Sequence, residues 1–329
     1  MFTHLVTHSG AFHADDLFAA AALRRLAPLA TLVRTRDAAH AFALAEEGGV
    51  VFDVGMIHDP VRRLFDHHQP DRDLRPAVAG KEAVPYSAFG LVWQVYGHQV
   101  VGKVLAIPPT DPRVDEVWGR LDRGFVTWVD MGDNGVVPPE HEGVKHPMSI
   151  TRVLETFVPP FDAPADDMDR AFLAAMGVAG AILEAKIVQV AAEARASQVA
   201  RAAIAGRADP RWAELPQGMP YLHAVRQEKA DELLYVLMPD RGQDQWSVSA
   251  VRKSDGPLGC RKPMPAAWAG LRDADLARAS GVPDAVFCHL GRFLAIARSR
   301  EGALALLMAA LDTPLEAMPP ADTDGARQA

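Results

Sequence analysis

Three clusters of His and Asp lie within the first seventy residues, each beside an apolar run that is typical of a strand. The third cluster, Asp66-His67-His68, is the densest, and the others surround His8 and Asp53. Imidazole and carboxylate ligands together suit borderline and hard divalent cations. Two such cations held close together activate water for attack on a phosphate ester. This pattern therefore predicts a two-metal hydrolase site in the N-terminal half.

The N-terminal half alternates between apolar runs and segments with helical spacing. We predict strands at 5–7, 50–53 and 63–66, and helices at 15–29, 87–96 and 114–129. This alternation indicates an α/β fold with a mostly parallel sheet and helices on both faces. Ligand sites in such sheets lie beyond the carboxyl ends of the strands. His8, Asp53 and Asp66 all follow predicted strands, so we expect them to form one site.

The C-terminal half predicts a second, smaller α/β domain behind a helical connector. A long Ala-rich helix with one buried face is expected at 168–205, followed by a loop at 206–220. Strands are then expected at 222–225, 233–238, 246–251 and 285–289, with a helix at 300–311. The predicted domains are a metal-binding catalytic domain at 1–157, the connector at 158–220, the substrate domain at 221–313 and a flexible tail at 314–329.

Each candidate ligand also has a simpler explanation. A single His beside a strand is usually a core or surface residue, and either Asp15 or Asp16 could cap the following helix. Asp53 ends a strand that is apolar on both sides, where a carboxylate is costly unless it is paired or metal-bound. We interpret it as a ligand that bridges two cations. Because neighbouring side chains on an extended segment point to opposite sides, His67 can bind metal while His68 faces substrate.

The last ligand is expected from the run VDMGDNG at 129–135. At least one of Asp130 and Asp133 should bind metal, and the choice between them stays open because turn chemistry also explains this run. Neutral His with several Asp nearly balances two divalent cations, which lower the pKa of a bridging water. His68 would donate a hydrogen bond to a phosphoryl oxygen or protonate the leaving group. Mn²⁺ or Mg²⁺ suits this donor set better than structural zinc.

These clusters resemble the four motifs of the DHH phosphoesterase superfamily. Their finer wording resembles its Myg-type (melanocyte-proliferating-gene) exonuclease branch: THSGAFHADD at 7–16, FDVG at 52–55, HDP at 58–60 and FDHHQ at 65–69. The resemblance continues through PAAWAGLRD at 265–273, SGVP at 280–283 and REGAL at 300–304, so it covers nearly the whole chain.

The resemblance implies a metal-dependent phosphodiesterase, a 3′–5′ exonuclease acting on RNA or short oligonucleotides. It implies two divalent cations, Mn²⁺ rather than Mg²⁺. Its catalytic residues would be His68 and Asp66, and its metal ligands His8, His13, Asp15, Asp53, His67, Asp130 and Asp133. One departure is His13, where the superfamily usually has Asp. The other is the run GRFLAIA at 291–297, which lacks a Gly pair after Phe293; Ala and Ile there hinder close approach of a phosphate.

The predicted substrate domain is locally basic. Phosphate contacts supply much of the affinity for nucleic acid, so we expect substrate-binding roles for Arg261, Lys262, Arg292 and Arg298. The alternative is an ordinary solvated face. Two other functions also stay open, a small-molecule phosphohydrolase acting on pyrophosphate or a nucleotide, and a non-catalytic metal-stabilised nucleotide-binding module.

Composition narrows the setting. A net charge of −8 argues against a protein that coats nucleic acid in bulk. No apolar run reaches the roughly 20 residues of a membrane helix, so no membrane partner is expected. Cys260 and Cys288 do not make a disulfide framework and no secretory signal is seen, which favours a reducing cytoplasm. A homodimer is kept as an open alternative to a monomer.

Overall fold

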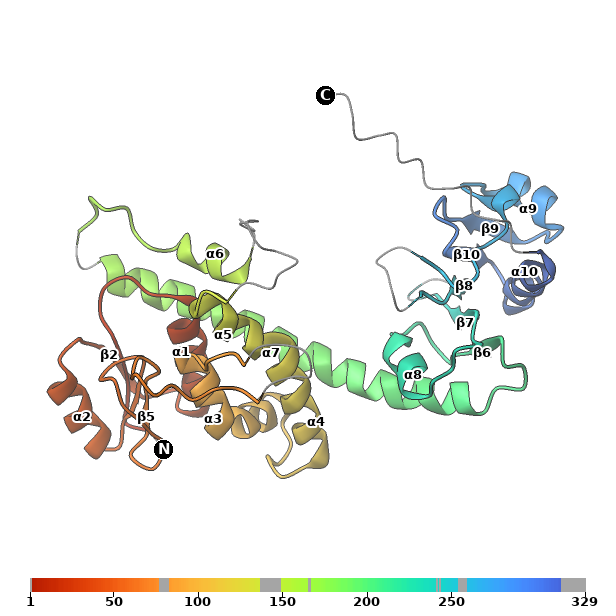
Figure 1. The fold of residues 1–329 in the computed structure, drawn as a ribbon. Helices are drawn as coiled ribbons and strands as arrows, with labels where there is room; N and C mark the ends of the chain where they lie inside the picture. Colours follow the sequence, from red (N-terminus) through yellow and green to blue (C-terminus); the bar gives the residue numbers. More distant parts are fainter. Residues whose placement is uncertain are drawn as a thin grey trace. The chain divides into compact units, whose positions relative to one another are not determined.

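The computed structural model describes residues 2–76, 83–136, 149–164, 167–240, 242, 244–253 and 259–314 (Figure 1). The chain divides into two compact units, Met1–Ala194 and Arg195–Ala329. The division falls inside helix α7 (Asp167–Ala205), which contributes to the hydrophobic cores of both units. The domain boundaries predicted from the sequence stay predictions. Only residue 314 of the predicted tail lies among the described residues.

The first unit contains a five-stranded sheet of order β2-β1-β3-β5-β4. Its strands are β1 (His4–Thr7), β2 (Thr31–Arg34), β3 (Val50–Phe52), β4 (His58–Asp59) and β5 (Leu64–Phe65). All pairs are parallel except that of β4 with β5. The predicted, mostly parallel sheet is therefore confirmed. Strands β2 and β4 were not predicted: β4 has only two residues, and β2 has no fully buried residue to mark it.

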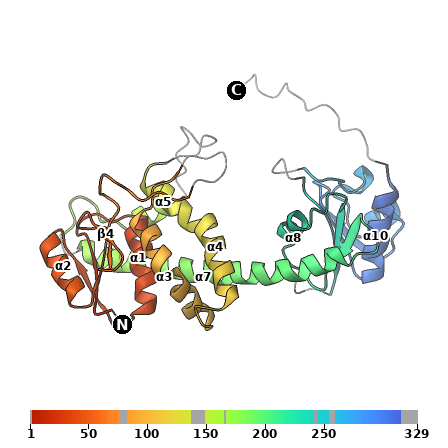
Figure 2. The same cartoon turned by 60° about the horizontal axis from the view of Figure 1, so that its bottom comes forward.

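Helices cover both faces of this sheet, as predicted. The helices of this unit before α7 are α1 (Ala14–Leu26), α2 (Ala38–Glu46), α3 (Ala88–Leu105), α4 (Pro112–Leu121), α5 (Thr127–Asp133) and α6 (Ile150–Glu155), of which α1, α2 and α3 contact the sheet. Leu5, Val50 and Phe52 pack into the core with α1 and α3, whereas Val6 and Val51 pack against α2. Alternate strand residues point to opposite faces, which is why α2 lies across the strands from α1 and α3 (Figure 2).

The helix predicted at 114–129 is not a single regular α-helix. A π-helical segment, η1 (Asp122–Val126), separates α4 from α5. A π-turn inserts a residue into the helical repeat and so changes which side chains face inward. The apolar spacing alone did not reveal this insertion.

Helix α7 presents one buried face along its length, as its spacing predicted. Phe172, Ala179 and Leu183 lie in the first core, and Ala200 and Ile204 lie in the core of the second unit. By length and composition this helix could also cross a membrane. One such helix is weak evidence for a membrane span, because the core helices of soluble proteins have the same length and composition. The expectation that no run is long and apolar enough was wrong, and the absence of a membrane partner stays a prediction.

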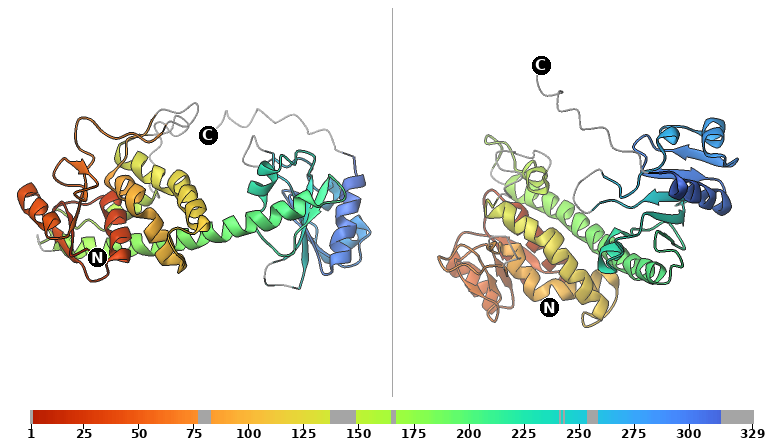
Figure 3. Two further views of the ribbon diagram at one scale, coloured as in Figure 1. Left: turned by 90° about the horizontal axis from the view of Figure 1, so that it is seen from below. Right: turned by 45° about the vertical axis from the view of Figure 1, so that its right-hand side comes forward.

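The second unit contains a five-stranded sheet of order β6-β7-β8-β10-β9. Its elements are β6 (Trp212–Glu214), α8 (Leu222–Gln227), β7 (Tyr235–Pro239), β8 (Trp246–Ala250), the 3₁₀ turn η3 (Ala266–Trp268), α9 (Asp273–Ser280), β9 (Ala285–Cys288), β10 (Leu294–Ala297) and α10 (Arg300–Asp312). Helix α10 packs against β7, β8 and β10 (Figure 3). The predicted second α/β unit is therefore present.

Two local predictions for this unit were wrong. The strand expected at 222–225 is helix α8, in which Val225 N–H donates to the Tyr221 carbonyl. A short apolar run has no periodicity that separates strand from helix. The loop expected at 206–220 contains β6, which pairs in parallel with β7. Strand β10 and helix α9 were not predicted at all.

Gly90 marks the close approach of α3 to α5. A Cβ atom at this position would lie 2.5 Å from Oδ1 of the buried Asp130. We expect Gly90→Ala to lower the free energy of unfolding by about 1–3 kcal/mol, because neither backbone nor carboxylate has room to move. The matched control is Gly177→Ala on exposed α7 surface, where nothing lies within 4 Å. Alanine there should stabilise the helix by up to about 1 kcal/mol. Urea unfolding followed by circular dichroism measures both, and equal effects would contradict the expectation.

Candidate metal centre

The His and Asp clusters meet at one edge of the first sheet. His8 follows β1, Asp53 follows β3, and Asp66 follows β5, so parallel pairing brings all three to the carboxyl edge. Helix α1 begins at the same edge, with His13 at its N-cap and Asp15 in its first turn. The predicted convergence of the clusters is therefore what the structure shows.

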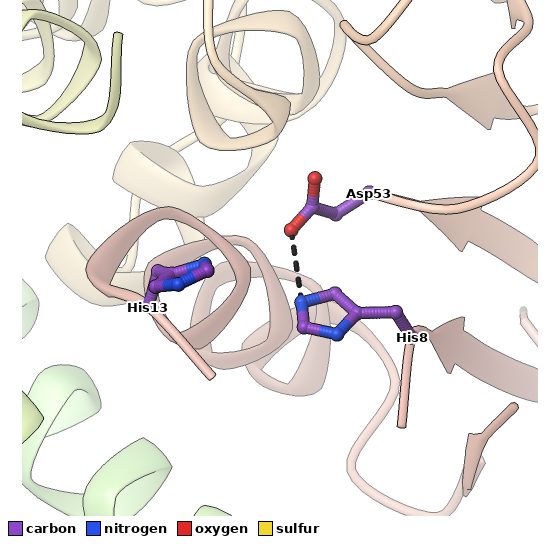
Figure 4. A group of neighbouring side chains, drawn as sticks. All are labelled: His8, His13 and Asp53. Carbon is purple, nitrogen blue, oxygen red and sulfur yellow. Dashed lines mark ion pairs between the residues drawn. The ribbon is translucent and has the colours of Figure 1, made fainter. Parts of the chain in front are cut away.

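Asp53 lies between two groups of histidines. Its Oδ2 is 3.2 Å from Nε2 of His8, while its Oδ1 is 3.4 Å from Nε2 of His67 and 3.6 Å from Nδ1 of His68. Figure 4 shows His8 and Asp53 pointing toward each other, with His13 beside them. Asp53 adopts a φ of 56°, a left-handed conformation that Asp tolerates better than most residues. Oδ2 of Asp53 thus faces His8, whereas Oδ1 faces His67 and His68.

Three groups of side chains have donor atoms within 4.8 Å of one another, the span of a bound cation. They are His8, His13 and Asp53; then Asp53, His67 and His68; and finally His13, Asp15 and Asp133. Neighbouring groups share Asp53 or His13, so the sites that they define are adjacent. Adjacent sites with a common carboxylate are what a two-cation centre needs.

The burial of its carboxylates indicates that the cluster needs a cation. Asp15, Asp16 and Asp53 are at most 4% exposed. Within the described part of the chain, Oδ1 of Asp15 has no hydrogen-bond partner. Burial, with the charges of Asp53 and Asp133, raises the pKa of Asp15 well above its usual range. Unpaired buried charges are unstable, so the cluster fits a divalent ion, which would neutralise them.

The pKa of His8 predicts how cation binding depends on pH. Burial lowers this pKa, but pairing with Asp16 and Asp53 overcomes burial and raises it to about 10. In the metal-free protein these ion pairs stabilise the fold below the ordinary histidine pKa, and the stabilisation is lost as pH rises toward 10. A histidine ligand must be neutral, so a cation bound by His8 would expel this proton.

We therefore expect the apparent affinity for Mn²⁺ to rise by about tenfold per pH unit between about pH 7 and 8.5. Isothermal titration calorimetry in two buffers of different ionisation enthalpy measures the proton released by the protein. His40→Ala, which removes an exposed imidazole from α2, is the control and should release as much. A pH-independent affinity without proton release would contradict the assignment of His8 as a ligand.

Of the two aspartates that could cap the following helix, Asp16 takes the capping role. Its Oδ1 accepts a hydrogen bond from the backbone of His13 at 3.0 Å, which completes a capping box at the start of α1. Its Oδ2 lies 3.1 Å from Nε2 of His8. Asp16 therefore fixes the backbone of one candidate ligand and the imidazole of another, and Asp15 stays the predicted ligand. An acidic residue three positions after an N-cap is the sequence signal for this role.

Asp66 organises the turn that carries the two histidines. Its Oδ1 accepts from the backbone of His67 at 2.7 Å and lies 2.7 Å from Nδ1 of His68, and its Oδ2 accepts from Met56 N–H at 2.5 Å. Burial opposes ionisation, but these hydrogen bonds lower the pKa of Asp66 overall. The hydrogen bond to Asp66 in turn raises the pKa of His68. Asp66, predicted as catalytic, thus contacts His68 directly, and its catalytic role stays a prediction.

The two histidines differ in exposure, but they do not point to opposite sides as predicted, since their ring centres lie 4.3 Å apart and both have a donor atom close to Asp53. The side chain of His67 is 7% exposed and lies 3.3 Å from Oδ2 of Asp133, whereas the side chain of His68 is 57% exposed. His67 therefore faces the carboxylates and His68 faces outward.

Of the two aspartates that the sequence could not separate, only Asp133 reaches the cluster. Asp130 is fully buried and accepts hydrogen bonds from Arg75 and from the backbone and hydroxyl of Ser87. Burial raises the pKa of Asp130 to about 6, although Arg75 and Ser87 oppose the shift. The geometry therefore supports Asp133 as the ligand and gives Asp130 a different task.

The four predicted substrate-binding residues lie in the second unit, where Arg261 and Lys262 bond to backbone carbonyls. Arg261 Nη1 donates to the carbonyls of Ala230 and Leu233, and Lys262 Nζ donates to that of Leu311 at 2.7 Å. Arg298 lies 3.7 Å from an oxygen of Asp273. Arg292 occupies a turn with a φ of 55°. The contacts of Arg261 and Lys262 are those of residues that stabilise loops, and the predicted substrate roles stay untested.

A buried His–Asp cluster at the carboxyl edge of a parallel sheet is the donor set of a metal-dependent hydrolase. The sequence matches the family model MYG1_exonuc, described as "Uncharacterised protein family (UPF0160)", over residues 4–311. The chain belongs to this family, which confirms the Myg-type resemblance of its motifs.

Named relatives match over almost the whole chain. It is 30% identical to MYG1 protein C27H6.8 of Caenorhabditis elegans, with 93% of this chain and 94% of the relative covered. It is 31% identical to the MYG1 exonuclease of Bos taurus and 29% identical to that of Homo sapiens, with 93% of this chain and 84% and 85% of those relatives covered.

Solved structures show only distant likeness. A pGpG-specific phosphodiesterase, PggH, from Vibrio cholerae matches at 13% identity and a TM-score of 0.28, with 95% of this chain and 100% of that chain covered. RecJ from Thermus thermophilus, solved in complex with Mn²⁺, matches at 15% identity and a TM-score of 0.26, with 94% and 52% covered. At these values we draw nothing further from them.

Proposed function

We propose that this chain is a 3′–5′ exonuclease that hydrolyses RNA or short oligonucleotides with two divalent cations, Mn²⁺ in preference to Mg²⁺. The observation that carries the proposal is the place of Asp53, whose two oxygens face His8 on one side and His67 on the other. The names of the MYG1 exonuclease relatives support nucleic acid as the substrate class.

Each side chain has a proposed task. His8, His13 and Asp53 would hold one cation, and Asp15, Asp53, His67 and Asp133 would hold the other. When bound, the cations would supply a hydroxide near neutral pH and stabilise the charge that develops on the phosphate. His68, exposed and oriented by Asp66, would donate a hydrogen bond to a phosphoryl oxygen or a proton to the leaving oxygen. The mixture of imidazole and carboxylate favours Mn²⁺.

The setting of the enzyme is also a proposal. Cys260 and Cys288 are free thiols, which fits a reducing compartment such as the cytoplasm. We propose a cytoplasmic enzyme without a membrane partner, and keep a homodimer as an alternative to a monomer.

The test is hydrolysis of single-stranded RNA labelled at the 3′ or the 5′ end, in Mn²⁺ and in Mg²⁺, with pyrophosphate and a dinucleotide in parallel. Stepwise shortening from the 3′ end in Mn²⁺, abolished by EDTA, is the expected result. Hydrolysis of pyrophosphate with intact RNA would overturn the proposed substrate and make the chain a small-molecule phosphohydrolase. Binding of Mn²⁺ and nucleotide without hydrolysis of any of these would overturn the enzymatic role.

A further inference from the structure

Arg75 is a buried cation that none of the predicted site roles uses. Its side chain is 6% exposed, and it lies in the segment that follows the Asp66-His67-His68 motif. Its Nη1 donates to Oδ2 of Asp122 at 2.9 Å, and its Nε donates to Oδ2 of Asp130. The guanidinium carbon also lies 4.7 Å from the centre of the Tyr86 ring. A planar guanidinium that joins two carboxylates fixes their separation and their orientation.

One of the two carboxylates begins the π-helical segment, and the other lies beyond its end. Asp122 is the first residue of η1, and Asp130 belongs to α5, which follows it. A π-turn is less regular than an α-helix and depends on surrounding contacts to persist. Here the carbonyl of Asp122 accepts a hydrogen bond from the Thr127 hydroxyl at 2.7 Å, within the same turn. Arg75 therefore spans the irregular turn and sets the rotation of α5 relative to α4.

The rotation of α5 decides where Asp133 points. Residues three apart on a helix share a face, so fixing Asp130 also fixes Asp133, which lies 3.3 Å from Nε2 of His67. Arg72, three residues before Arg75, donates to Oδ1 of Asn134 at 2.9 Å. Arg75 and Arg72 thus bond to Asp130 and Asn134, which lie on either side of Asp133 in the sequence.

The start of α3 connects the same network to a second candidate ligand. Ser87, the N-cap of α3, donates its hydroxyl to Oδ1 of Asp130 at 2.6 Å. The next backbone amide, that of Ala88, donates to Oδ2 of Asp15 at 3.3 Å. Asp15 and Asp133 belong to one candidate ligand group together with His13. Asp130 is therefore connected to both carboxylates of this group, to Asp15 through the start of α3 and to Asp133 along α5.

We propose that Arg75 is a positioning residue of the metal centre: by joining Asp122 to Asp130 across η1, it aims Asp133 at the cation shared with Asp15 and His67. This inference rests on the proposed function only in requiring that the centre bind divalent cations. The competing explanation is that Arg75 merely neutralises the buried charge of Asp130. The two explanations predict different Mn²⁺ affinities when the charges of Arg75 and Asp130 are removed together.

The experiment measures Mn²⁺ binding by calorimetry and thermal unfolding in EDTA for three variants of the full chain. Arg75→Met leaves Asp130 unpaired, and it should lower both the unfolding temperature and the affinity for the weaker Mn²⁺ ion. In the double variant Arg75→Met/Asp130→Asn the fully buried residue 130 is neutral. Asp122 keeps its charge, but its side chain is 17% exposed and still accepts a hydrogen bond from Gln94, so most of the lost stability should return. Arg113→Met, which breaks an exposed pair with Asp111 on α4, is the control and should change neither quantity.

The double variant decides the proposal. If Arg75 positions the centre, the affinity for one Mn²⁺ stays about ten- to a hundredfold below the wild-type value although stability has returned. If both stability and affinity return, Arg75 only neutralises charge and the proposal is overturned. Because binding is read without turnover, an inactive wild-type chain would overturn the proposed function and still leave this test intact.

Discussion

Asp53→Asn should abolish hydrolysis, with a loss of turnover of about 10³-fold or more, and should remove both high-affinity Mn²⁺ ions. Asp53 is the side chain that faces His8 with one oxygen and His67 with the other. An amide carries no charge and offers one oxygen, so it cannot serve two cations. Loss of several kcal/mol of transition-state stabilisation corresponds to an effect of this size.

Asparagine is the appropriate replacement because of the backbone at this position. The φ of 56° at Asp53 is tolerated by Asn but disfavoured for Ala. The fold should therefore survive, and circular dichroism of the variant should match the wild type. Asp71→Asn, at an exposed carboxylate on the loop after the same motif, is the control and should keep full activity and both ions. Full activity in Asp53→Asn would exclude the two-cation centre.

His68→Ala should lower turnover by about 10²- to 10⁴-fold while Mn²⁺ binding stays within about twofold of the wild type. The reason is that His68 is 57% exposed and held by Asp66, outside the buried set of carboxylates that includes Asp53 and Asp15. A group in this place can reach a substrate at the open side of the centre. Single-turnover kinetics with calorimetry on the same preparation measure both quantities.

The alternative for His68 is metal ligation, since its donor atom also lies close to Asp53 and His67. A parallel loss of Mn²⁺ affinity and turnover in His68→Ala would assign it as a ligand. His67→Ala provides the comparison, because a buried ligand should lose both together. His98→Ala, at the half-buried end of a pair with Asp115 on α4, should leave both unchanged.

The convergence of the clusters could be predicted because it follows from local patterns and one rule of sheets. His8, Asp53 and Asp66 each come directly after a short buried strand. Once such strands pair in parallel, their carboxyl ends must meet at one edge. The rule that neighbouring side chains on an extended segment point to opposite sides did not hold for His67 and His68, whose ring centres lie 4.3 Å apart.

Asp130 and Asp133 show a choice between two candidate ligands that sequence patterns cannot make. Both are aspartates in one short run, and either could have been the ligand. The choice depends on Arg75, which is 55 positions away from Asp130 in sequence, and on Ser87. A local sequence pattern cannot predict a contact between residues so far apart in sequence. It also does not predict the π-turn, which changes which side chains of α5 face inward.

The sequence by itself determined the mostly parallel α/β architecture of the first unit and the residue types of its centre, because both depend on short periodic patterns. Only the tertiary structure decided that Asp133 joins the cluster, that Asp16 caps α1, and that Arg261 and Lys262 bind carbonyls of their own unit. It also showed that residues 222–225, which were predicted as a strand, belong to helix α8. The physical reason is that burial and pairing of a polar side chain depend on partners distant in sequence, and those partners meet only in the folded chain.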